Sequence, residues 1–197
     1  MSEKKESKVI NLAPDWTSLS DAELIAFFKE SSSSDRAFRE VLARYQKRVY
    51  FHVRRIVIDH DDASDVLQNT FIKVYGGLPN FRSDSKLFTW IYRIATNEAL
   101  TFLKKKKLRF FIPLVDVESQ LSRQIETDPL VSADQIQQKL QKAILRLPEK
   151  QRVVFNMRYY DEIPYEEMSA ILGTSVGALK ASYHHAFKKI EKFLRED

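Results

Sequence analysis

The sequence predicts an all-helical protein with two helical domains joined by an acidic linker. Apolar residues recur every three or four positions over several long stretches, which is the period of an amphipathic helix. Only four of the 197 residues are glycine, few for an architecture rich in tight β-turns. The helical period fades between Leu108 and about Ser132. We therefore expect a loose tail over residues 1–18, a first domain over 19–107, a linker over 108–133 and a second domain over 134–197.

The first domain is predicted to hold four helices. Ser20 and Glu23 form a capping-box pattern at the start of the first, and Asp35 can cap the second. A third helix is expected from near Asp61 until the glycines and proline at 76–79, and a fourth from about Lys86 to Lys106. Four helices with short connections in about 90 residues are typical of a bundle. The second helix has the clearest apolar stripe: Phe38, Val41, Leu42, Tyr45, Val49, Val53 and Ile56.

The second domain is predicted to hold four shorter helices, of which the last two resemble a helix-turn-helix. The segment YEEMSAILGTSVGALKASY places Met168, Leu172 and Leu179 where two crossing helices share a core. Gly173 suits a left-handed turn, and Ser175 can cap the following helix. The second helix of such a motif enters the DNA major groove. An ordinary helical hairpin with a basic face remains an alternative at this point.

Charge along the chain favours a polyanionic partner. The net charge is +5, with a basic run at 104–109, five acids between Val115 and Gln135, and a basic C-terminal stretch. The chain has no cysteine, which excludes disulfides and thiolate zinc sites within it. No apolar run is long enough to span a membrane or to act as a secretory signal, so we expect a cytoplasmic protein. Neighbouring His184 and His185 point about 100° apart on a helix, which disfavours a shared metal ion.

The predicted fourth helix and the loop before it form a candidate single-strand site. Trp90, Arg93 and Asn97 share one helical face, and aromatic rings in the preceding loop can stack on unpaired bases. The alternative is that Phe81, Phe88 and Trp90 belong to the core. Acidic residues at the start of the third helix are favourable at a helix N-terminus, and no catalytic constellation accompanies them. Its exposed residues can also form a protein-binding face.

Two parts of the chain resemble regions two and four of the bacterial sigma-70 superfamily. The segments are DASDVLQNTFIKVY, NFRSDSKLFTWIYRIATNEALTFLKKKK, and LPEKQRVVFNMRYYDEIPYEEMSAILGTSVGALKASYHHAFKKIEKFL. The short chain is similar to the extracytoplasmic-function (ECF) subgroup, and the likeness covers about residues 20–107 and 134–194. It implies a sigma factor that is not an enzyme, needs no cofactor or small-molecule substrate, and recognises the −10 and −35 promoter elements.

The resemblance also implies roles for particular residues. The β′ clamp helices of core RNA polymerase would be bound by Asp62, Asp65, Gln68, Asn69, Phe71 and Tyr75. The β flap of the polymerase is a further implied contact. The −10 element would be read and melted by Phe81, Arg82, Ser85, Lys86, Phe88, Trp90, Arg93 and Asn97. The −35 element would be read by Ser175, Lys180, Tyr183, His184, His185 and Lys188. An anti-sigma factor, commonly membrane-anchored in this subgroup, is also implied.

Three other classes of protein explain the sequence less well. A stand-alone helix-turn-helix regulator would explain the second domain but not a polymerase-binding helix followed by a base-capturing loop. An RNA-binding or scaffold protein is favoured only by the basic charge. A hydrolase is disfavoured because the sequence shows no nucleophile and base at a spacing that would let them act together. The chain departs from many relatives in carrying lysine and histidines in its recognition helix instead of arginines. Because lysine lacks the arginine fork, the −35 sequence preference cannot be transferred from relatives.

Overall fold

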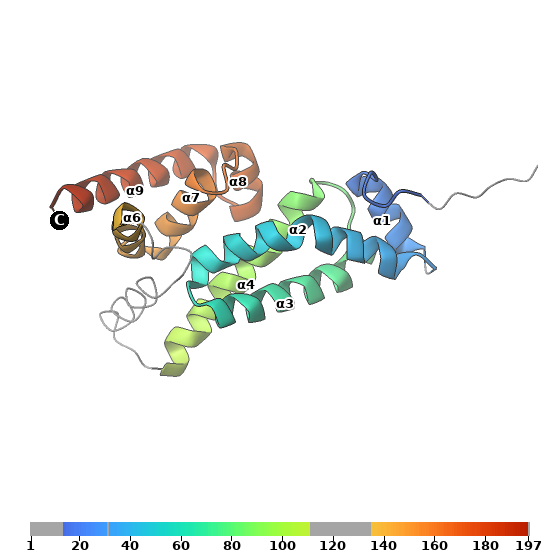
Figure 1. The fold of residues 1–197 in the computed structure, drawn as a ribbon. Helices are drawn as coiled ribbons and strands as arrows, with labels where there is room; N and C mark the ends of the chain where they lie inside the picture. The colour runs from blue at the N-terminus through green and yellow to red at the C-terminus, as the bar shows by residue number, and fades with distance from the viewer. Residues whose placement is uncertain (1–13, 31, 111–134, 197) are drawn as a thin grey trace, which may run out of the picture.

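The computed structural model describes residues 14–30, 32–110 and 135–196, and within these ranges the regular elements are all helical (Figure 1). The first domain contains α1 (Asp21–Lys29), α2 (Ser34–Val57), α3 (His60–Gly77), a short 3₁₀ turn (Leu78–Asn80) and α4 (Leu87–Phe110). The second contains α6 (Gln135–Leu145), α7 (Glu149–Tyr159), α8 (Tyr165–Leu172) and α9 (Val176–Glu196). The all-helical prediction is confirmed for these residues, whereas the predicted acidic linker lies outside them. No described helix is both long and apolar enough to cross a membrane.

Helix α1 begins with the predicted capping box. The Glu23 amide donates to Ser20 Oγ at 3.3 Å, and the Ser20 amide donates to Glu23 Oε2 at 2.7 Å. The prediction of a loose tail as far as residue 18 is wrong for its last residues. Trp16 packs against Phe27 with ring centroids 5.1 Å apart, and the guanidinium of Arg36 lies 5.0 Å from its ring centroid. An aromatic contact and a cation–π contact therefore tie this segment to the bundle.

The predicted helix boundaries in the first domain shift by a few residues. Helix α2 starts at Ser34, so Asp35 lies in its first turn and does not cap it. Helix α3 starts at His60 because the Asp59 carboxylate accepts from the amides of Asp61 and Asp62, each at 3.0 Å. Helix α4 continues past the predicted end at Lys106. These changes leave the apolar stripes facing the core.

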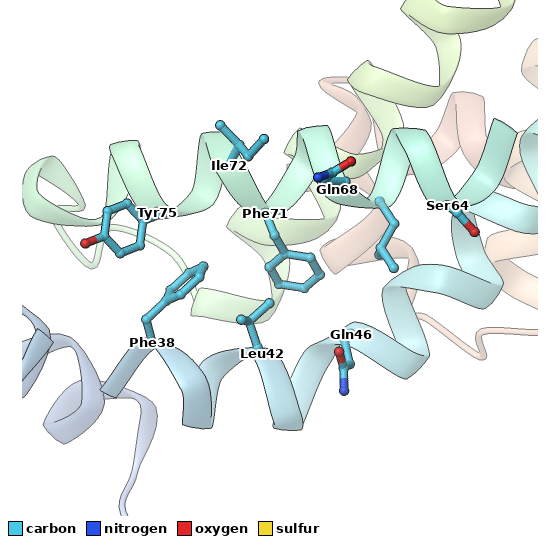
Figure 2. Close-up of a pocket in the computed structure, with 9 residues that line it drawn as sticks. Phe38, Leu42, Gln46, Ser64, Gln68, Phe71, Ile72 and Tyr75 are labelled. Atoms are coloured by element: carbon cyan, nitrogen blue, oxygen red, sulfur yellow. The ribbon is translucent and has the colours of Figure 1, made fainter. Parts of the chain in front are cut away.

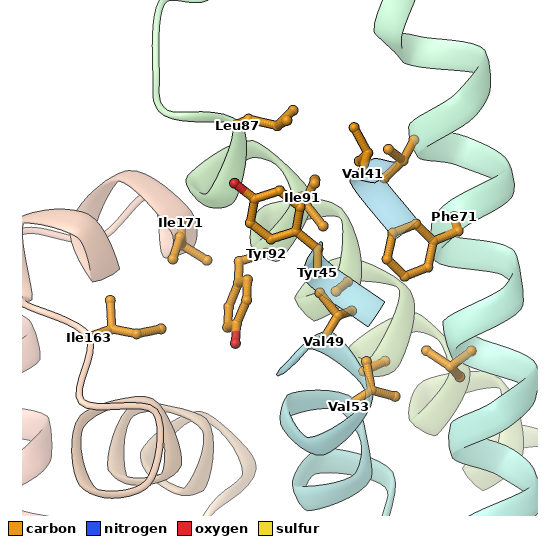
Figure 3. Packing of buried hydrophobic residues seen from close by; sticks show 14 of the residues in the cluster. Val41, Tyr45, Val49, Val53, Phe71, Leu87, Ile91, Tyr92, Ile163 and Ile171 are labelled. Carbon is orange, nitrogen blue, oxygen red and sulfur yellow. The ribbon is translucent and has the colours of Figure 1, made fainter. Parts of the chain in front are cut away.

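The core of the first domain extends into the second. In the bundle α2 packs against α1, α3 and α4, and its buried stripe includes Val41, Val49 and Val53. Ile163 and Ile171 of the second domain point toward Tyr92 of α4 (Figure 3). A smaller cluster around Phe155 and Ile190 joins α6, α7 and α9. The two domains therefore share one large core, and the second domain keeps a smaller cluster of its own.

The second domain lies along one side of the bundle. Helix α7 contacts α2, and α8 contacts α4. Helix α3 lies on the other side of α2, away from α7 and α8 (Figure 1). One face of the first domain is therefore covered by the second domain, while the α3 face is not.

Candidate nucleic-acid and protein interfaces

The C-terminal helix pair has helix-turn-helix geometry. Helix α8 ends at Gly173, whose φ of 62° is left-handed, and the Gly173 amide donates to the Ser169 carbonyl at 2.9 Å. Ser175 Oγ accepts from the Ala178 amide at 3.3 Å, which caps α9. Met168 and Leu179 are buried between the helices, and Leu172 is partly buried. The predictions for the turn, the cap and the shared core are thus confirmed.

The outward face of α9 carries exposed histidines and basic residues. His184 and His185 are exposed, and their ring centroids lie 6.1 Å apart. Lys180 Nζ lies 5.8 Å from the Tyr165 ring centroid, and Lys188 Nζ donates to Glu191 Oε2 at 3.1 Å. Among the described residues, no three or more His, Cys, Asp or Glu side chains are grouped as metal ligands would be. This face can offer positive charge and imidazole groups to a DNA groove.

Tyr183 differs from its neighbours on α9 because its ring packs inward. It stacks on Phe155 with ring centroids 5.6 Å apart and planes 12° apart, and it meets Tyr165 edge-on. Burial raises the pKa of the Tyr183 hydroxyl, and the nearby Tyr165 adds to that rise. The ring of Tyr183 therefore supports the helix-turn-helix core.

The candidate −10 aromatics are more buried than a freely accessible stacking site would be. Phe81 is only 7% exposed and packs on Trp90 with ring centroids 4.9 Å apart. Phe88 is half-buried, and its ring centroid lies 4.2 Å from the Tyr92 ring centroid. The Arg48 guanidinium lies 4.6 Å from the Phe88 ring centroid. The polar members of the set are outward: Arg82, Lys86, Arg93 and Asn97 are exposed, and Ser85 is half-buried.

Two of these outward residues contact the second domain. Lys86 Nζ donates to Glu167 Oε1 of α8 at 2.6 Å. Arg93 Nε donates to the carbonyl oxygen of Ala170 at 3.0 Å, and its Nη2 donates to the same oxygen. The last carbonyls of a helix lack partners within it, so the guanidinium satisfies an otherwise open acceptor at the negative end of α8.

A shallow apolar groove of about 450 Å³ lies between α2 and α3 (Figure 2). Phe38 and Leu42 of α2 face Phe71 and Tyr75 of α3 across it. Phe71 forms part of the core, whereas Ile72 is 61% exposed and Tyr75 is 44% exposed. Exposed apolar side chains beside a groove are typical of a protein-binding site. Of the predicted polymerase-binding residues, Gln68, Phe71 and Tyr75 line this groove.

The other predicted polymerase contacts lie on the same helix. Asp65 and Asn69 are exposed on α3. Asp62 is half-buried and forms an ion pair with Lys106 of α4. Its carboxylate therefore also ties the start of α3 to the end of α4.

A buried polar cluster joins the two domains, and sequence patterning did not predict it. Asp161 Oδ2 accepts from His52 Nδ1 at 2.8 Å, and its Oδ1 accepts from Arg55 at 2.6 Å. His52 Nε2 lies 2.9 Å from Thr96 Oγ1, and Arg48 donates to the Asp161 carbonyl at 3.2 Å. His52 is fully buried, and the Asp161 side chain is 4% exposed. No local motif marks a single histidine in α2 and a single aspartate in a turn as partners.

The geometry defines a helix-turn-helix DNA-binding protein with an added helical bundle that carries an apolar groove. A family model described as Sigma-70 region 2 matches residues 41–109, and one described as Sigma-70, region 4 matches residues 137–190. Together these models match more than half of the chain.

Curated relatives agree with these matches. The chain is 31% identical over 170 residues to the RNA polymerase sigma-H factor of Pseudomonas aeruginosa, covering 81% of this chain and 87% of that one. It is 32% identical over 166 residues to the ECF RNA polymerase sigma-E factor of Escherichia coli (strain K12), covering 79% and 85%. It is 29% identical over 168 residues to the ECF sigma factor SigW of Bacillus subtilis, covering 81% and 90%.

Two solved structures have the same fold. The structure of CnrH in complex with the cytosolic domain of CnrY gives a TM-score of 0.66 at 23% identity, covering 90% of this chain and 98% of that chain. The sigma factor RpoE in complex with the anti-sigma factor NepR from Bartonella quintana gives 0.64 at 21% identity, covering 81% and 98%. The chain belongs to the sigma-70 family as an ECF sigma factor, which directs promoter-specific transcription initiation through regions 2 and 4 and is not itself an enzyme.

Proposed function

We propose that α9 reads the −35 element, that α4 and the loop before it read and help melt the −10 element, and that α3 binds core RNA polymerase. The observation that carries this proposal is the Gly173 turn, which presents a capped, basic and solvent-exposed α9. Catalysis then belongs to the polymerase, and the chain supplies promoter choice.

The −35 reading is supported by the outward side chains of α9. Ser175 caps the helix and leaves its first turn facing outward, where a DNA phosphate is favourable. Lys180 and Lys188 supply phosphate contacts, and His184 and His185 reach toward base edges. Tyr183 contributes through its hydroxyl edge, because its ring is occupied by the core contact with Phe155.

The −10 reading is supported by a line of polar groups beside aromatic rings. Arg82, Ser85 and Asn97 offer hydrogen bonds to a displaced strand, and Trp90 is half-buried. Capture of a base on Phe81 would require the loop to move, because its ring already packs on Trp90, and the Phe88 ring in the first turn of α4 already packs on Tyr92. We therefore assign the first contact with the strand to the polar residues, and base capture to a rearranged loop.

Polymerase binding is supported by the groove between α2 and α3. A helix from the β′ clamp could place an apolar side chain against Ile72 and Tyr75, while Asp65, Gln68 and Asn69 offer polar contacts around it. The β flap is a further proposed contact, made by the second domain. Because polymerase and promoters are its partners, we place the protein in the cytoplasm.

An anti-sigma factor is the proposed inhibitor, and a membrane-anchored one fits the subgroup. Support comes from the RpoE neighbour, which was solved with the anti-sigma factor NepR, and from the CnrH neighbour, which was solved with the cytosolic domain of CnrY. A pull-down with the full chain from its own cells, followed by mass spectrometry, should recover such a partner together with core polymerase.

The decisive experiment mixes the purified full chain with core RNA polymerase and a library of promoter fragments. We expect new transcripts that require both proteins and whose start sites share upstream motifs. Absence of polymerase binding would overturn the proposal. Tight, sequence-specific binding of duplex DNA by the chain alone would instead indicate a stand-alone regulator.

A histidine substitution tests the −35 assignment. His185→Ala should weaken binding of the selected promoters and change the preferred −35 sequence, because an exposed imidazole on the recognition face would be lost. Phe187→Ala is the matched control, since it also removes an exposed ring from α9, at a position outside the proposed −35 set. Equal behaviour of the two variants would contradict a base contact by His185.

A further inference from the structure

The loop between the 3₁₀ turn and α4 is held at its first residue by α1. Lys29, in the last turn of α1, donates from Nζ to the carbonyl oxygen of Phe81 at 3.3 Å. The Phe81 amide donates to the Leu78 carbonyl at 3.1 Å, so both backbone polar groups of Phe81 are bonded. Helix α1 also contacts the 3₁₀ turn itself. A helix that carries none of the proposed DNA or polymerase contacts is therefore linked directly to the proposed −10 loop.

The ring of Phe81 is held from a second direction by Trp90. Their ring centroids lie 4.9 Å apart, and a Cβ added at Gly77 would lie 2.8 Å from Trp90 Cζ2. This distance is shorter than the roughly 3.5–4.0 Å at which two carbon atoms pack. The Trp90 ring can occupy its position only because residue 77 has no side chain. The backbone of Phe81 is thus held by α1, and its ring is held by a tryptophan packed on the end of α3.

The rest of the loop is exposed between two buried residues. Phe81 is 7% exposed and Leu87 is 2% exposed, whereas the residues from Arg82 to Asp84 are exposed. Ser83 has a φ of 61°, a left-handed conformation that is unfavourable for a residue with a side chain. Such a conformation persists where the surrounding structure holds it. The fixed position of Phe81 therefore constrains the course of the exposed segment that follows it.

We propose that Lys29 is a positioning residue for the −10 loop, which it holds where the Phe81 ring packs on Trp90. This inference rests on the proposed −10 role of the loop. Capture of a base on the Phe81 ring requires the ring to leave Trp90, so the hydrogen bond from Lys29 opposes that movement. Loss of one such bond shifts an equilibrium by about fivefold. Helix α1 thereby sets how readily a base is captured, without any contact between α1 and DNA.

The test compares Lys29→Met with Lys47→Met in the full chain. Both substitutions remove one exposed lysine and keep an unbranched side chain, but Lys47 lies on α2, outside the proposed DNA contacts. Lys29→Arg keeps a cationic donor and is the conservative variant. Gly77→Ala, which displaces the Trp90 ring, is a second and independent way to release the loop. Its matched control is Gly76→Ala, because an added Cβ there has nothing within 4 Å.

Amide hydrogen exchange of the segment 78–86 measures the position of the loop without DNA. We expect exchange about fivefold faster in Lys29→Met, and rates equal to those of the parent chain in Lys29→Arg and Lys47→Met. Exchange should also be faster in Gly77→Ala than in Gly76→Ala. Circular dichroism checks that each variant keeps its helical content. Exchange that neither Lys29→Met nor Gly77→Ala accelerates would overturn the proposal.

Strand opening is then measured with core polymerase and a promoter selected by transcription. The permanganate reactivity of thymines in the −10 element, followed at several polymerase concentrations, separates the affinity of the first complex from the opening rate at saturation. Lys29→Met should raise the opening rate about fivefold and leave the first affinity equal to that of Lys47→Met. Lys29→Arg should restore the parent rate. A contact that only stabilised the fold would not accelerate opening, so an unchanged or slower rate in Lys29→Met contradicts the positioning role.

Arg82→Ala distinguishes failure of this inference from failure of the −10 assignment. If Arg82→Ala slows opening while Lys29→Met leaves it unchanged, the −10 role of the loop stands and the positioning role is wrong. If Lys29→Met accelerates exchange but neither variant changes opening, the −10 assignment is wrong and the inference falls with it.

Discussion

The guanidinium of Arg93 donates to the carbonyl oxygen of Ala170, so a residue of the proposed −10 face provides a hydrogen-bond donor to the C-terminal turn of α8. The two residues are 77 positions apart in the chain. The same guanidinium fork that donates to a backbone carbonyl oxygen can also donate to a phosphate oxygen. The contact therefore links domain packing to DNA binding through one side chain.

Arg93→Gln should weaken promoter binding by the polymerase complex about equally for all promoters. Loss of one phosphate contact should lower the slope of log affinity against log salt by about 1. The measurement is promoter binding over a salt series. Lys150→Gln is the control, because it removes one positive charge from an exposed position on α7. An unchanged slope for Arg93→Gln would show that Arg93 does not contact a phosphate.

Ile72→Glu should weaken binding to core RNA polymerase by about tenfold or more, because burying an apolar side chain of this size is worth about 1.5–3 kcal/mol. Its side chain is 61% exposed at the α2–α3 groove, so the free energy of unfolding should change little. Competition binding with labelled chain measures the effect. Leu108→Glu, at a residue 69% exposed on α4, is the control. An equal loss of polymerase affinity in both variants would show that the groove is not part of the polymerase interface.

Gly173→Ala should destabilise the chain by about 1–2 kcal/mol, because a φ of 62° brings an L side chain close to the backbone. Gly177→Ala should instead be neutral or stabilise by up to about 1 kcal/mol, since it lies in α9 with open space around its Cα. Urea unfolding of both variants measures the two changes. The turn assignment fails if the two glycines respond alike.

Ser20→Ala should destabilise the first domain by about 1 kcal/mol through loss of the α1 cap. Ser64→Ala is the control, because the Ser64 hydroxyl only bonds back to the His60 carbonyl within α3. Thermal unfolding at neutral pH distinguishes the two. A loss no larger for Ser20→Ala than for Ser64→Ala would contradict the role of the cap.

Acid should remove the part of this cap that depends on Glu23. Hydrogen bonds from the Ser20 side chain and backbone lower the pKa of the Glu23 carboxyl from its ordinary value of 4.5. A lowered folded-state pKa contributes stability above the unfolded-state pKa, and this contribution is lost as pH falls through the folded-state value. The difference in stability between the parent chain and Glu23→Ala should therefore be present at pH 7 and shrink below about pH 4.5. A difference that does not depend on pH would exclude this linkage.

Local features were predictable because their partners are near in sequence. Ser20 and Glu23 are three residues apart, and Gly173 lies two positions before the Ser175 cap. The apolar spacing of Met168 and Leu179 also predicted the shared core of the helix pair. Family resemblance added the assignment of α3 and α4 to polymerase and DNA, which periodicity alone cannot provide.

The contacts between domains were not predictable in the same way. His52 and Asp161 are 109 positions apart, and each looks like an isolated polar residue in its own segment. The acceptor for Arg93 is a backbone carbonyl, which carries no side-chain signal. The sequence allows Phe81 to be either a core residue or a base-stacking residue, and only the packing of its ring on Trp90 in three dimensions shows how the ring is occupied.

The packing of Ile163 and Ile171 near Tyr92 has a thermal consequence. Separating these side chains would hydrate apolar surface and increase the heat capacity of the chain. The hydrophobic part of the attraction between the domains therefore weakens on cooling. Growth temperature would then change the free energy of association between the two domains directly, without the involvement of another protein.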